Sequence, residues 1–341
     1  MNGKERILTA LRMEEPDRVP VFPLGDYYCA SVAGLSVREF ATNGENMAAG
    51  LLAGRERFGW DGIDVGCDVA LEGEALGGEC EYPEDSVPYI VKHVLTNHED
   101  LKKLKVPNPL KDGRMPVVVR ATEIVVKEVG DDVFIESVIM GPLNGASQAR
   151  GVNELMMDTL DRPDFVEDLL DFINKVVFEY GKAQIDAGSP GLILGEALCT
   201  PTFCPPNFYR EKVLPRQQKL ISDLKKYGAK YINLHVCGDT TKILPDMAET
   251  GADILDIDWQ VDMADAKRLV AGKVAVRGNL NPSTLLLQGT PEKVYEEAAR
   301  IIKTAGAGGG IILGSGCDVP VPTPYENVDA ITQASKDTKA S

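Results

Sequence analysis

The chain alternates short apolar runs with longer amphipathic stretches along its whole length. Eight apolar runs are present: Val19–Pro23, Gly62–Asp68, Val133–Ile139, Gly191–Glu196, Tyr231–Val236, Asp253–Asp258, Val274–Gly278 and Gly310–Gly314. They are short, mostly rich in β-branched residues, and several are bounded by glycine or aspartate, which is typical of buried strands. Amphipathic patterns between them predict helices over Ser36–Phe58, Asp164–Ala187, Asn207–Tyr227 and Pro291–Ala305.

Eight strands that alternate with helices predict an α/β protein of the (β/α)8 TIM-barrel class. Such barrels often exceed 250 residues as one unit, so we expect residues 1–341 to form a single domain. Two stretches interrupt the alternation. Glu72–Val91 is expected to form a hairpin or long loop, and the proline-rich Val106–Pro116 a surface excursion. Both are too short to be domains.

The composition narrows the choice of partners. The formal net charge is −16 and aromatic residues make up 6%, so we expect neither nucleic acid nor an anionic membrane as a partner. The N-terminus is charged within a few residues, and no apolar run approaches the length of a membrane span. Seven cysteines without a secretion signal predict reduced thiols and a cytoplasmic protein.

Candidate chemistry lies at the ends of two predicted strands. His235 and Cys237 end the fifth strand and, being two residues apart, point to the same face. Cys317 follows the eighth strand, which ends at the same barrel mouth. One imidazole and two thiolates suit Zn²⁺, and three protein ligands leave a fourth position open, as in catalytic sites.

Each of these residues alone is more often structural, since cysteine is commonly a small buried hydrophobe. Their joint placement favours a metal site. Cys199 and Cys204 have no histidine beside them, and we interpret them as packing residues; His93 and His98 are interpreted as surface residues. The acidic candidates for the open position, or for orienting the ligands, are Asp239, Asp256, Asp258 and Asp318.

Several segments resemble landmarks of the uroporphyrinogen decarboxylase superfamily. They are Pro16–Pro20, Gly141–Leu143, Arg277–Pro282 and Thr323–Asn327. Within the superfamily, the run His-Val-Cys-Gly-Asp-Thr-Thr at 235–241 resembles the branch of cobamide-dependent methyltransferases, typified by methylcobamide:coenzyme M methyltransferase. The resemblance implies a (β/α)8 barrel, in agreement with the strand pattern.

The decarboxylase branch fits less well. Asp68 resembles the aspartate with which the decarboxylases bind pyrrole nitrogens, but Phe22–Val37 lacks the arginines that grip substrate carboxylates. Gln148 stands in place of an active-site tyrosine, and Cys317 in place of a histidine. An enzyme for an octa-anionic tetrapyrrole needs its cationic clamp.

The methyltransferase resemblance implies a zinc set of His235, Cys237 and Cys317 with Asp258 as a further ligand. It implies transfer of a methyl group between a methylcobamide, carried by a separate small corrinoid protein, and a zinc-activated thiol or related acceptor. The residues predicted to bind substrate are Asp68, Gln148, Arg150, Arg277 and Asn279. For Arg150 and Arg277, the candidates for holding an anionic group of the acceptor, a structural salt bridge is the alternative.

The sequence does not decide the identity of the methyl acceptor. Coenzyme M, another small thiol and a pterin-linked carrier all fit the sequence. Two alternative functions also remain: a uroporphyrinogen decarboxylase-like enzyme, and a non-catalytic accessory protein that binds zinc or a corrinoid.

Overall fold

The computed structural model of this protein describes residues 1–66 and 68–340. Its main sheet contains seven parallel strands in the order β1-β4-β5-β6-β7-β8-β9. Their bounds are β1 (Gly62–Val65), β4 (Phe134–Met140), β5 (Gly191–Gly195), β6 (Tyr231–His235), β7 (Ile254–Ile257), β8 (Ala275–Leu280) and β9 (Ile311–Ser315). Cys67, which falls within the predicted strand Gly62–Asp68, lies outside the described residues.

The first predicted strand, Val19–Pro23, is reduced to one bridge, because Val21 pairs in parallel with Leu313 of β9. The prediction of a full strand there is wrong, since Pro20 and Pro23 carry no N–H for a ladder. The segment still closes the ring. Phe22 N donates to the Leu313 carbonyl on one side, and Asp61 N donates to the Val21 carbonyl on the other. The fold is therefore the (β/α)8 barrel that the sequence predicts.

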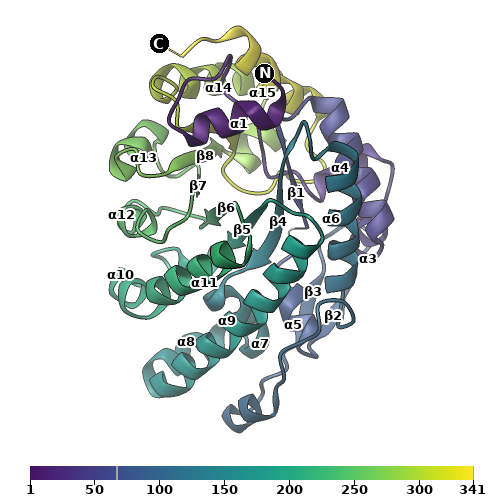
Figure 1. The fold of residues 1–341 in the computed structure, drawn as a ribbon, viewed down its shortest axis with the longest axis vertical. Helices are drawn as coiled ribbons and strands as arrows, with labels where there is room; N and C mark the ends of the chain where they lie inside the picture. Colours follow the sequence, from purple (N-terminus) through teal and green to yellow (C-terminus); the bar gives the residue numbers. More distant parts are fainter. Residues whose placement is uncertain (67, 341) are drawn as a thin grey trace.

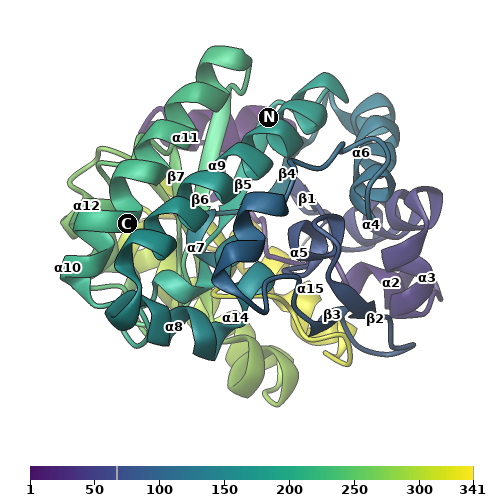
Figure 2. The same ribbon diagram turned by 90° about the horizontal axis from the view of Figure 1, so that it is seen from below.

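Helices surround the strands on the outside (Figures 1 and 2). The longer ones are α1 (Gly3–Leu11), α4 (Gly44–Phe58), α6 (Met115–Val129), α7 (Pro142–Arg150), α8 (Val152–Asp161), α9 (Pro163–Asp186), α11 (Leu214–Tyr227), α13 (Met263–Val270), α14 (Pro291–Ala305) and α15 (Tyr325–Asp337). Shorter ones are α2 (Tyr28–Val32), α3 (Val37–Thr42), α5 (Leu71–Ala75), α10 (Pro206–Phe208) and α12 (Leu244–Met247). Single turns of 3-10 helix are η1 (His98–Lys103) and η2 (Ala197–Cys199), and π-helical turns are η3 (Tyr209–Val213) and η4 (Pro282–Leu287).

The predicted long helix Ser36–Phe58 is two helices, α3 and α4, with Asn43 between them in extended backbone. The Asn43 side chain accepts a hydrogen bond from Asn46 N and caps α4, which is the local contact that ends one helix and begins the next. The stretch Glu72–Val91 contains most of α5 and an antiparallel hairpin of β2 (Glu79–Glu81) with β3 (Tyr89–Lys92).

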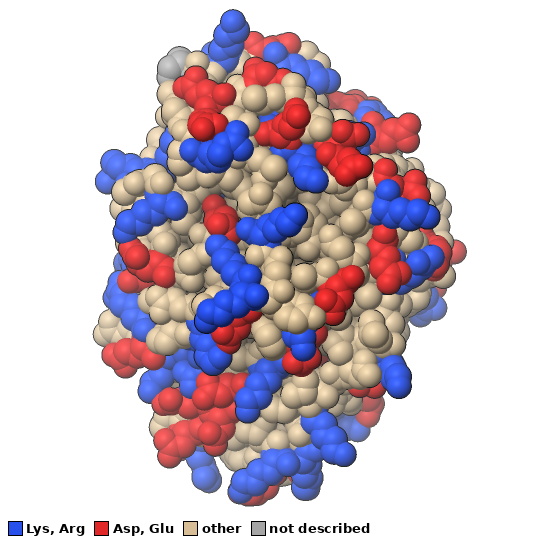
Figure 3. Space-filling view, in the orientation of Figure 1, with Lys and Arg blue, Asp and Glu red and all other residues tan. Residues whose placement is uncertain are grey.

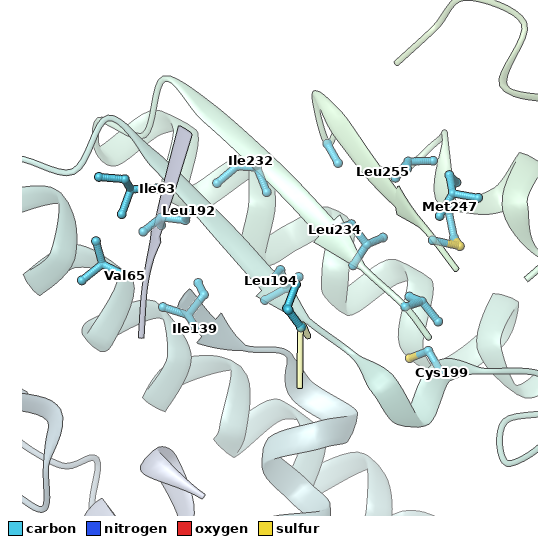
Figure 4. Packing of buried hydrophobic residues seen from close by; sticks show 14 of the residues in the cluster. Ile63, Val65, Ile139, Leu192, Leu194, Cys199, Ile232, Leu234, Met247 and Leu255 are labelled. Atoms are coloured by element: carbon cyan, nitrogen blue, oxygen red, sulfur yellow. The ribbon is translucent and has the colours of Figure 1, made fainter. Parts of the chain in front are cut away.

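Alternate residues of the strands point to opposite sides of the barrel wall. Figure 4 shows Ile63, Val65, Leu192, Leu194, Ile232 and Leu234 among the buried residues packed around the strands and neighbouring helices. The residues between them, such as Asp64 and Asn233, point into the barrel interior.

The barrel interior has an apolar layer at each end and a polar layer between them. At the N-terminal end of the strands, α1 packs Ile7 and Ala10 against a cluster comprising Phe22, Phe134, Ile254 and Ile312. At the other end, Leu24, Val138, Met140 and Ile193 form a second cluster. The polar middle layer is described below with the site it supports.

The molecular surface is mixed in charge. Figure 3 shows lysines and arginines interspersed with acidic residues over one face, despite the net charge of −16. In the part of the chain that the structure describes, no helix has both the length and the apolar character needed to cross a membrane.

Candidate metal centre

His235, the last residue of β6, lies at the C-terminal mouth of the barrel with Cys237 and Cys317. Its Nε2 atom is 3.1 Å from Cys237 Sγ and 4.0 Å from Cys317 Sγ, and the two sulfur atoms are 3.5 Å apart. Among the described residues, these three are the one group of His, Cys, Asp or Glu donors close enough together to hold a metal ion. The structure thus brings together the three donors expected from the sequence.

The spacing of these donors fits a zinc ion. With Zn–S of about 2.3 Å and Zn–N of about 2.0–2.1 Å, tetrahedral geometry separates the donor atoms by roughly 3.5–3.8 Å. The three observed distances, 3.1, 3.5 and 4.0 Å, bracket that range. Two thiolates and an imidazole also match the preference of zinc for soft and borderline ligands.

Asp256 fixes the orientation of the imidazole. His235 and Asp256 are partners in the parallel register of β6 and β7, and Nδ1 of His235 is 3.0 Å from Asp256 Oδ2. A carboxylate only accepts hydrogen bonds, so Nδ1 carries a proton, and Nε2 is the nitrogen that is left to bind a metal. A carboxylate behind a histidine ligand is a common feature of zinc sites.

Arg277 holds Asp256 in turn. It is the register partner of Asp256 on β8, and its Nε and Nη2 atoms donate to the two carboxylate oxygens at 2.7 Å each. Burial opposes ionisation of Asp256, but the charge of Arg277 and the hydrogen bonds from His235 and Arg277 hold its pKa well below the usual range. The carboxylate behind His235 is therefore ionised.

The polar middle layer contains more acidic groups than basic ones. Asp64 and Glu136 are register partners on β1 and β4, and both lie near Nη1 of Arg277, at 3.3 and 3.4 Å. Burial raises the pKa of Asp64 to about 6 and that of Glu136 well above its ordinary value. One arginine thus faces three carboxylates, and the layer retains protons that surface carboxylates would lose.

A small cavity of about 120 Å³ opens beside the three donors, and we call it the site cavity. Its apolar lining residues are Leu24, Val69, Val138, Met140, Ile193 and Ala197. Its polar ones, besides the donors themselves, are Asp26, Asn144 and Asp318. The cavity has room for a small aliphatic group next to the sulfur atoms.

Gly238 allows the chain to turn sharply after Cys237. Its φ of 82° lies in the left-handed region, and a Cβ there would lie 2.6 Å from Thr200 Oγ1. Only glycine fits both conditions. The turn leads the chain away from the cavity and leaves Cys237 at its wall.

Asp258 and Asn279 do not join the metal centre. The Asp258 carboxylate accepts a hydrogen bond from Gln260 N in a turn after β7, and it is outside the group of clustered donors. Asn279 donates its side-chain amide to the carbonyls of Asp258 and Val261 and lines a different surface groove. The geometry supports Asp258 and Asn279 as residues that shape the loop after β7, and does not support the expected roles in metal and substrate binding.

Asp68 lies at the barrel mouth, as expected from its place after β1, but it is not among the donors. Its carboxylate accepts hydrogen bonds from Tyr27 Oη, Ala70 N and Arg114. The Asp68 carboxylate therefore has its hydrogen-bond partners within the protein. Gln148, on α7, is packed against Gly73 and is not among the residues that line the site cavity.

Arg150 does not face the site cavity either. Its guanidinium forms an ion pair with Asp158 at 2.8 Å and donates to the carbonyls of Leu95 and Thr96. Arg277 is buried beneath Asp256, with an exposed fraction of 1%. Both arginines form structural salt bridges, which is the alternative to acceptor binding for these two residues. Neither guanidinium is available to an acceptor in this structure.

Two further cysteines, Cys199 and Cys204, and the two remaining histidines have structural surroundings. Cys199 and Cys204 are buried, as expected of packing residues. His93 Nδ1 contacts the Gln148 carbonyl, and His98 Nε2 contacts Asp158 at 2.8 Å. The two histidines join the chain after the hairpin to α7 and α8.

The sequence analysis did not identify the buried polar residues that lie behind His235 and hold it in place. Asp256 was one of four acidic candidates with nothing to single it out, and Asp64, Glu136 and Asn233 were overlooked. A signal was present, because each is a polar residue inside an otherwise apolar strand. Such residues must find partners in the barrel interior, where the neighbouring strands supply them.

The chain is similar over its full length to proteins of one family. The family model described as uroporphyrinogen decarboxylase (URO-D) matches residues 2–338. A methylcobamide:CoM methyltransferase of Methanosarcina acetivorans is 28% identical over 340 residues, covering 98% of each chain. A uroporphyrinogen decarboxylase of Psychromonas ingrahamii is 25% identical and covers 97% of each.

Solved structures agree as well. A methyltransferase from Methanosarcina mazei superposes with a TM-score of 0.89 at 30% identity, over 99% of each chain. A B12-independent methionine synthase from Shewanella superposes with a TM-score of 0.61 at 16% identity, which shows a common fold alone.

The chain therefore belongs to the uroporphyrinogen decarboxylase family. Within that family it is similar over its full length to methyltransferases, and it is an enzyme that transfers methyl groups.

Proposed function

We propose that this enzyme transfers a methyl group from a methylated corrinoid to a thiol at a zinc ion held by His235, Cys237 and Cys317. The observation that carries the proposal is the spacing of these donors, which brackets that of a tetrahedral zinc site, with a cavity beside them. Relatives named methylcobamide:CoM methyltransferases support the reaction class.

A free thiol has a pKa near 8.5 and is only about a few per cent thiolate at pH 7. His235, Cys237 and Cys317 would hold the zinc ion, which would supply the Lewis acidity that lowers the pKa of a bound thiol. The protein residues supply orientation. Asp256 fixes the His235 tautomer, Arg277 fixes Asp256, and the apolar lining excludes water from the reacting sulfur.

In the proposed step the thiolate sulfur attacks the methyl carbon in line with the cobalt–carbon bond. The S–C bond forms as the Co–C bond breaks, and the bonding electron pair stays on cobalt, which leaves as Co(I). The thiol proton has already passed to solvent. The products are a methyl thioether and the reduced corrinoid.

The corrinoid stays outside the site cavity in this proposal. A cavity of about 120 Å³ admits a methyl group and a small thiol but not a corrin macrocycle. We therefore propose that a separate small corrinoid protein docks at the barrel mouth. The chemistry needs reduced thiols, so a cytoplasmic location is part of the proposal.

The decarboxylase alternative is less well supported. Asp68, the residue that resembles the pyrrole-binding aspartate, is engaged by Arg114 and Tyr27. No arginine or lysine is among the described residues that line the site cavity, although a porphyrinogen brings eight carboxylates. An accessory protein without turnover would keep the metal and lack the reaction.

Removal and return of the metal test the proposal. Enzyme stripped with a chelator should lose thiol methylation and regain it with one equivalent of Zn²⁺ per chain. Enzyme that remains fully active after complete zinc removal would refute it. Zinc-replete protein that binds a corrinoid protein without turnover would favour the accessory role, and decarboxylation of uroporphyrinogen the decarboxylase.

A further inference from the structure

The charge of the site cavity bears on the identity of the methyl acceptor. Two carboxylates, Asp26 and Asp318, are among its lining residues, and both belong to loops that follow strand segments at the mouth. Asp26 is buried, with an exposed fraction of 4%. Among the described lining residues, the one basic side chain is the imidazole of His235, which is a metal donor.

Two arginines below and beside the site form ion pairs with carboxylates. Arg277 donates to Asp256 beneath the site. Arg114 lies in a separate small cavity that shares Val138 and Met140 with the site cavity. Its Nη1 and Nε atoms pair with Asp68 and Glu74, and its buried Nη2 atom has no hydrogen-bond partner among the described residues. Neither guanidinium extends into the space beside the donor sulfurs.

The metal ion would not supply the missing positive charge. Zn²⁺ bound by two thiolates and a neutral imidazole is formally neutral, and a third thiolate from the acceptor makes the centre negative. An acceptor with a sulfonate or carboxylate at its far end would place that anion among carboxylates and apolar side chains without a cationic partner. Desolvating an anion without a cationic partner is strongly unfavourable.

From this arrangement we infer that the acceptor is a small aliphatic thiol whose far end is uncharged or carries an ammonium group, and that the site cavity rejects anionic thiols. The inference rests on the proposed function and narrows its substrate class. It separates this enzyme from relatives whose names specify CoM, a thiol that carries a sulfonate. Unfavourable charge against the wrong ligand is a common basis of such specificity.

Three thiols of one length test the inference: 2-aminoethanethiol, 2-mercaptoethanol and 2-mercaptoethanesulfonate. Their dissociation constants from the zinc enzyme are measured by calorimetry without any methyl donor, so that the result does not depend on turnover. We expect the amine and the alcohol each to bind at least tenfold more tightly than the sulfonate. Equal binding, or tighter binding of the sulfonate, would overturn the inference.

A variant at the cavity wall tests the electrostatic cause. Val69 lines the cavity and is 39% exposed, so Val69→Lys adds a cation without disturbing the core. It should reduce the discrimination against the sulfonate at least fivefold, whereas the neutral control Val69→Gln should leave it within twofold. Comparing the same thiols on each variant cancels differences in their own thiol pKa values.

Replacement of a lining carboxylate gives an independent arm. Asp26→Asn should improve sulfonate binding severalfold, and Asp131→Asn, which removes the same charge from the exposed surface before β4, should not. Identical behaviour of these two variants would contradict a local effect of Asp26.

The outcomes distinguish the inference from the proposed function. If the sulfonate is bound and methylated best, the inference fails and the proposed function stands. If no thiol is methylated with zinc and a corrinoid protein present, the proposed function fails.

Discussion

His235 and Asp256 face each other across the β6–β7 register, with Nδ1 of the imidazole 3.0 Å from Oδ2 of the carboxylate. The register continues to Arg277 on β8. Three neighbouring strands thus each contribute one residue to a row of side-chain contacts that ends at the candidate metal donors. The orientation of His235 is thus determined by the sheet itself, which is more rigid than the loops around it.

The Asp256 contact predicts a loss of metal affinity on substitution. Asp256→Ala should weaken zinc binding by about 10–100-fold, because the imidazole loses the partner that fixes its tautomer and ring orientation. Competition with a chromophoric chelator measures the affinity. Asp258→Asn is the matched control and should bind zinc like the wild type; a loss in this variant would restore Asp258 as a ligand.

The cysteines differ in their expected effect on metal content. Cys237→Ser and Cys317→Ser should each contain much less than one zinc per chain by elemental analysis, whereas Cys199→Ala should retain it. Both donor variants should remain folded by circular dichroism, since the barrel core supplies the stability. Full zinc content in Cys237→Ser and Cys317→Ser would rule out the assignment.

Arg277 is expected to be important for stability. Arg277→Met removes the one positive charge that faces Asp64, Glu136 and Asp256 in the barrel interior. Leaving buried carboxylates without their partner should lower the free energy of unfolding by about 3–5 kcal/mol. Urea denaturation measures the change, and Arg120→Met, which breaks exposed ion pairs, should cost about 1 kcal/mol or less.

The raised pKa of Glu72 predicts that the stability of the folded protein depends on pH. Burial raises the pKa of its carboxyl to about 7 in the folded protein, whereas the unfolded value is about 4.3. Below the unfolded value both states are protonated and nothing is lost. As the pH rises toward 7 the unfolded state ionises first, so the free energy of unfolding falls by about 3–4 kcal/mol and then stays constant.

The variant Glu72→Gln keeps an acceptor for the Met140 amide and cannot ionise. Its stability relative to the wild type should therefore increase between pH 5 and pH 8 in urea denaturation. The exposed Glu123→Gln should show no such trend. A constant difference between Glu72→Gln and the wild type across this range would contradict the prediction.

Most of the fold could be predicted from the apolar pattern, because each strand of a parallel barrel is a short buried run between helices. Helix α14 begins at Pro291 and ends at Ala305, the bounds that the pattern indicates. The apolar pattern gave wrong bounds where local contacts determine the backbone conformation. Asn43 divides the predicted helix 36–58, and two prolines reduce the first strand to a bridge at Val21.

The proximity of His235, Cys237 and Cys317 could be predicted because their positions follow from strand ends, which sequence locates well. Roles that depend on side-chain partners could not. Arg277 and Arg150 are arginines near expected strand or helix ends, and only the structure shows that Asp256 and Asp158 occupy them. Asp256 itself stands out only once the β6–β7 register is known.

The most direct test of the central claim is a single-turnover experiment without oxygen. Zinc-replete enzyme is mixed with methylcobalamin, bound to its corrinoid protein, and with 2-mercaptoethanol, and the products are followed by absorbance and mass spectrometry. We predict one methyl thioether per reduced corrinoid, at a rate that falls by orders of magnitude in Cys317→Ala. No thioether from any small thiol, or an equal rate in Cys317→Ala, would contradict the account.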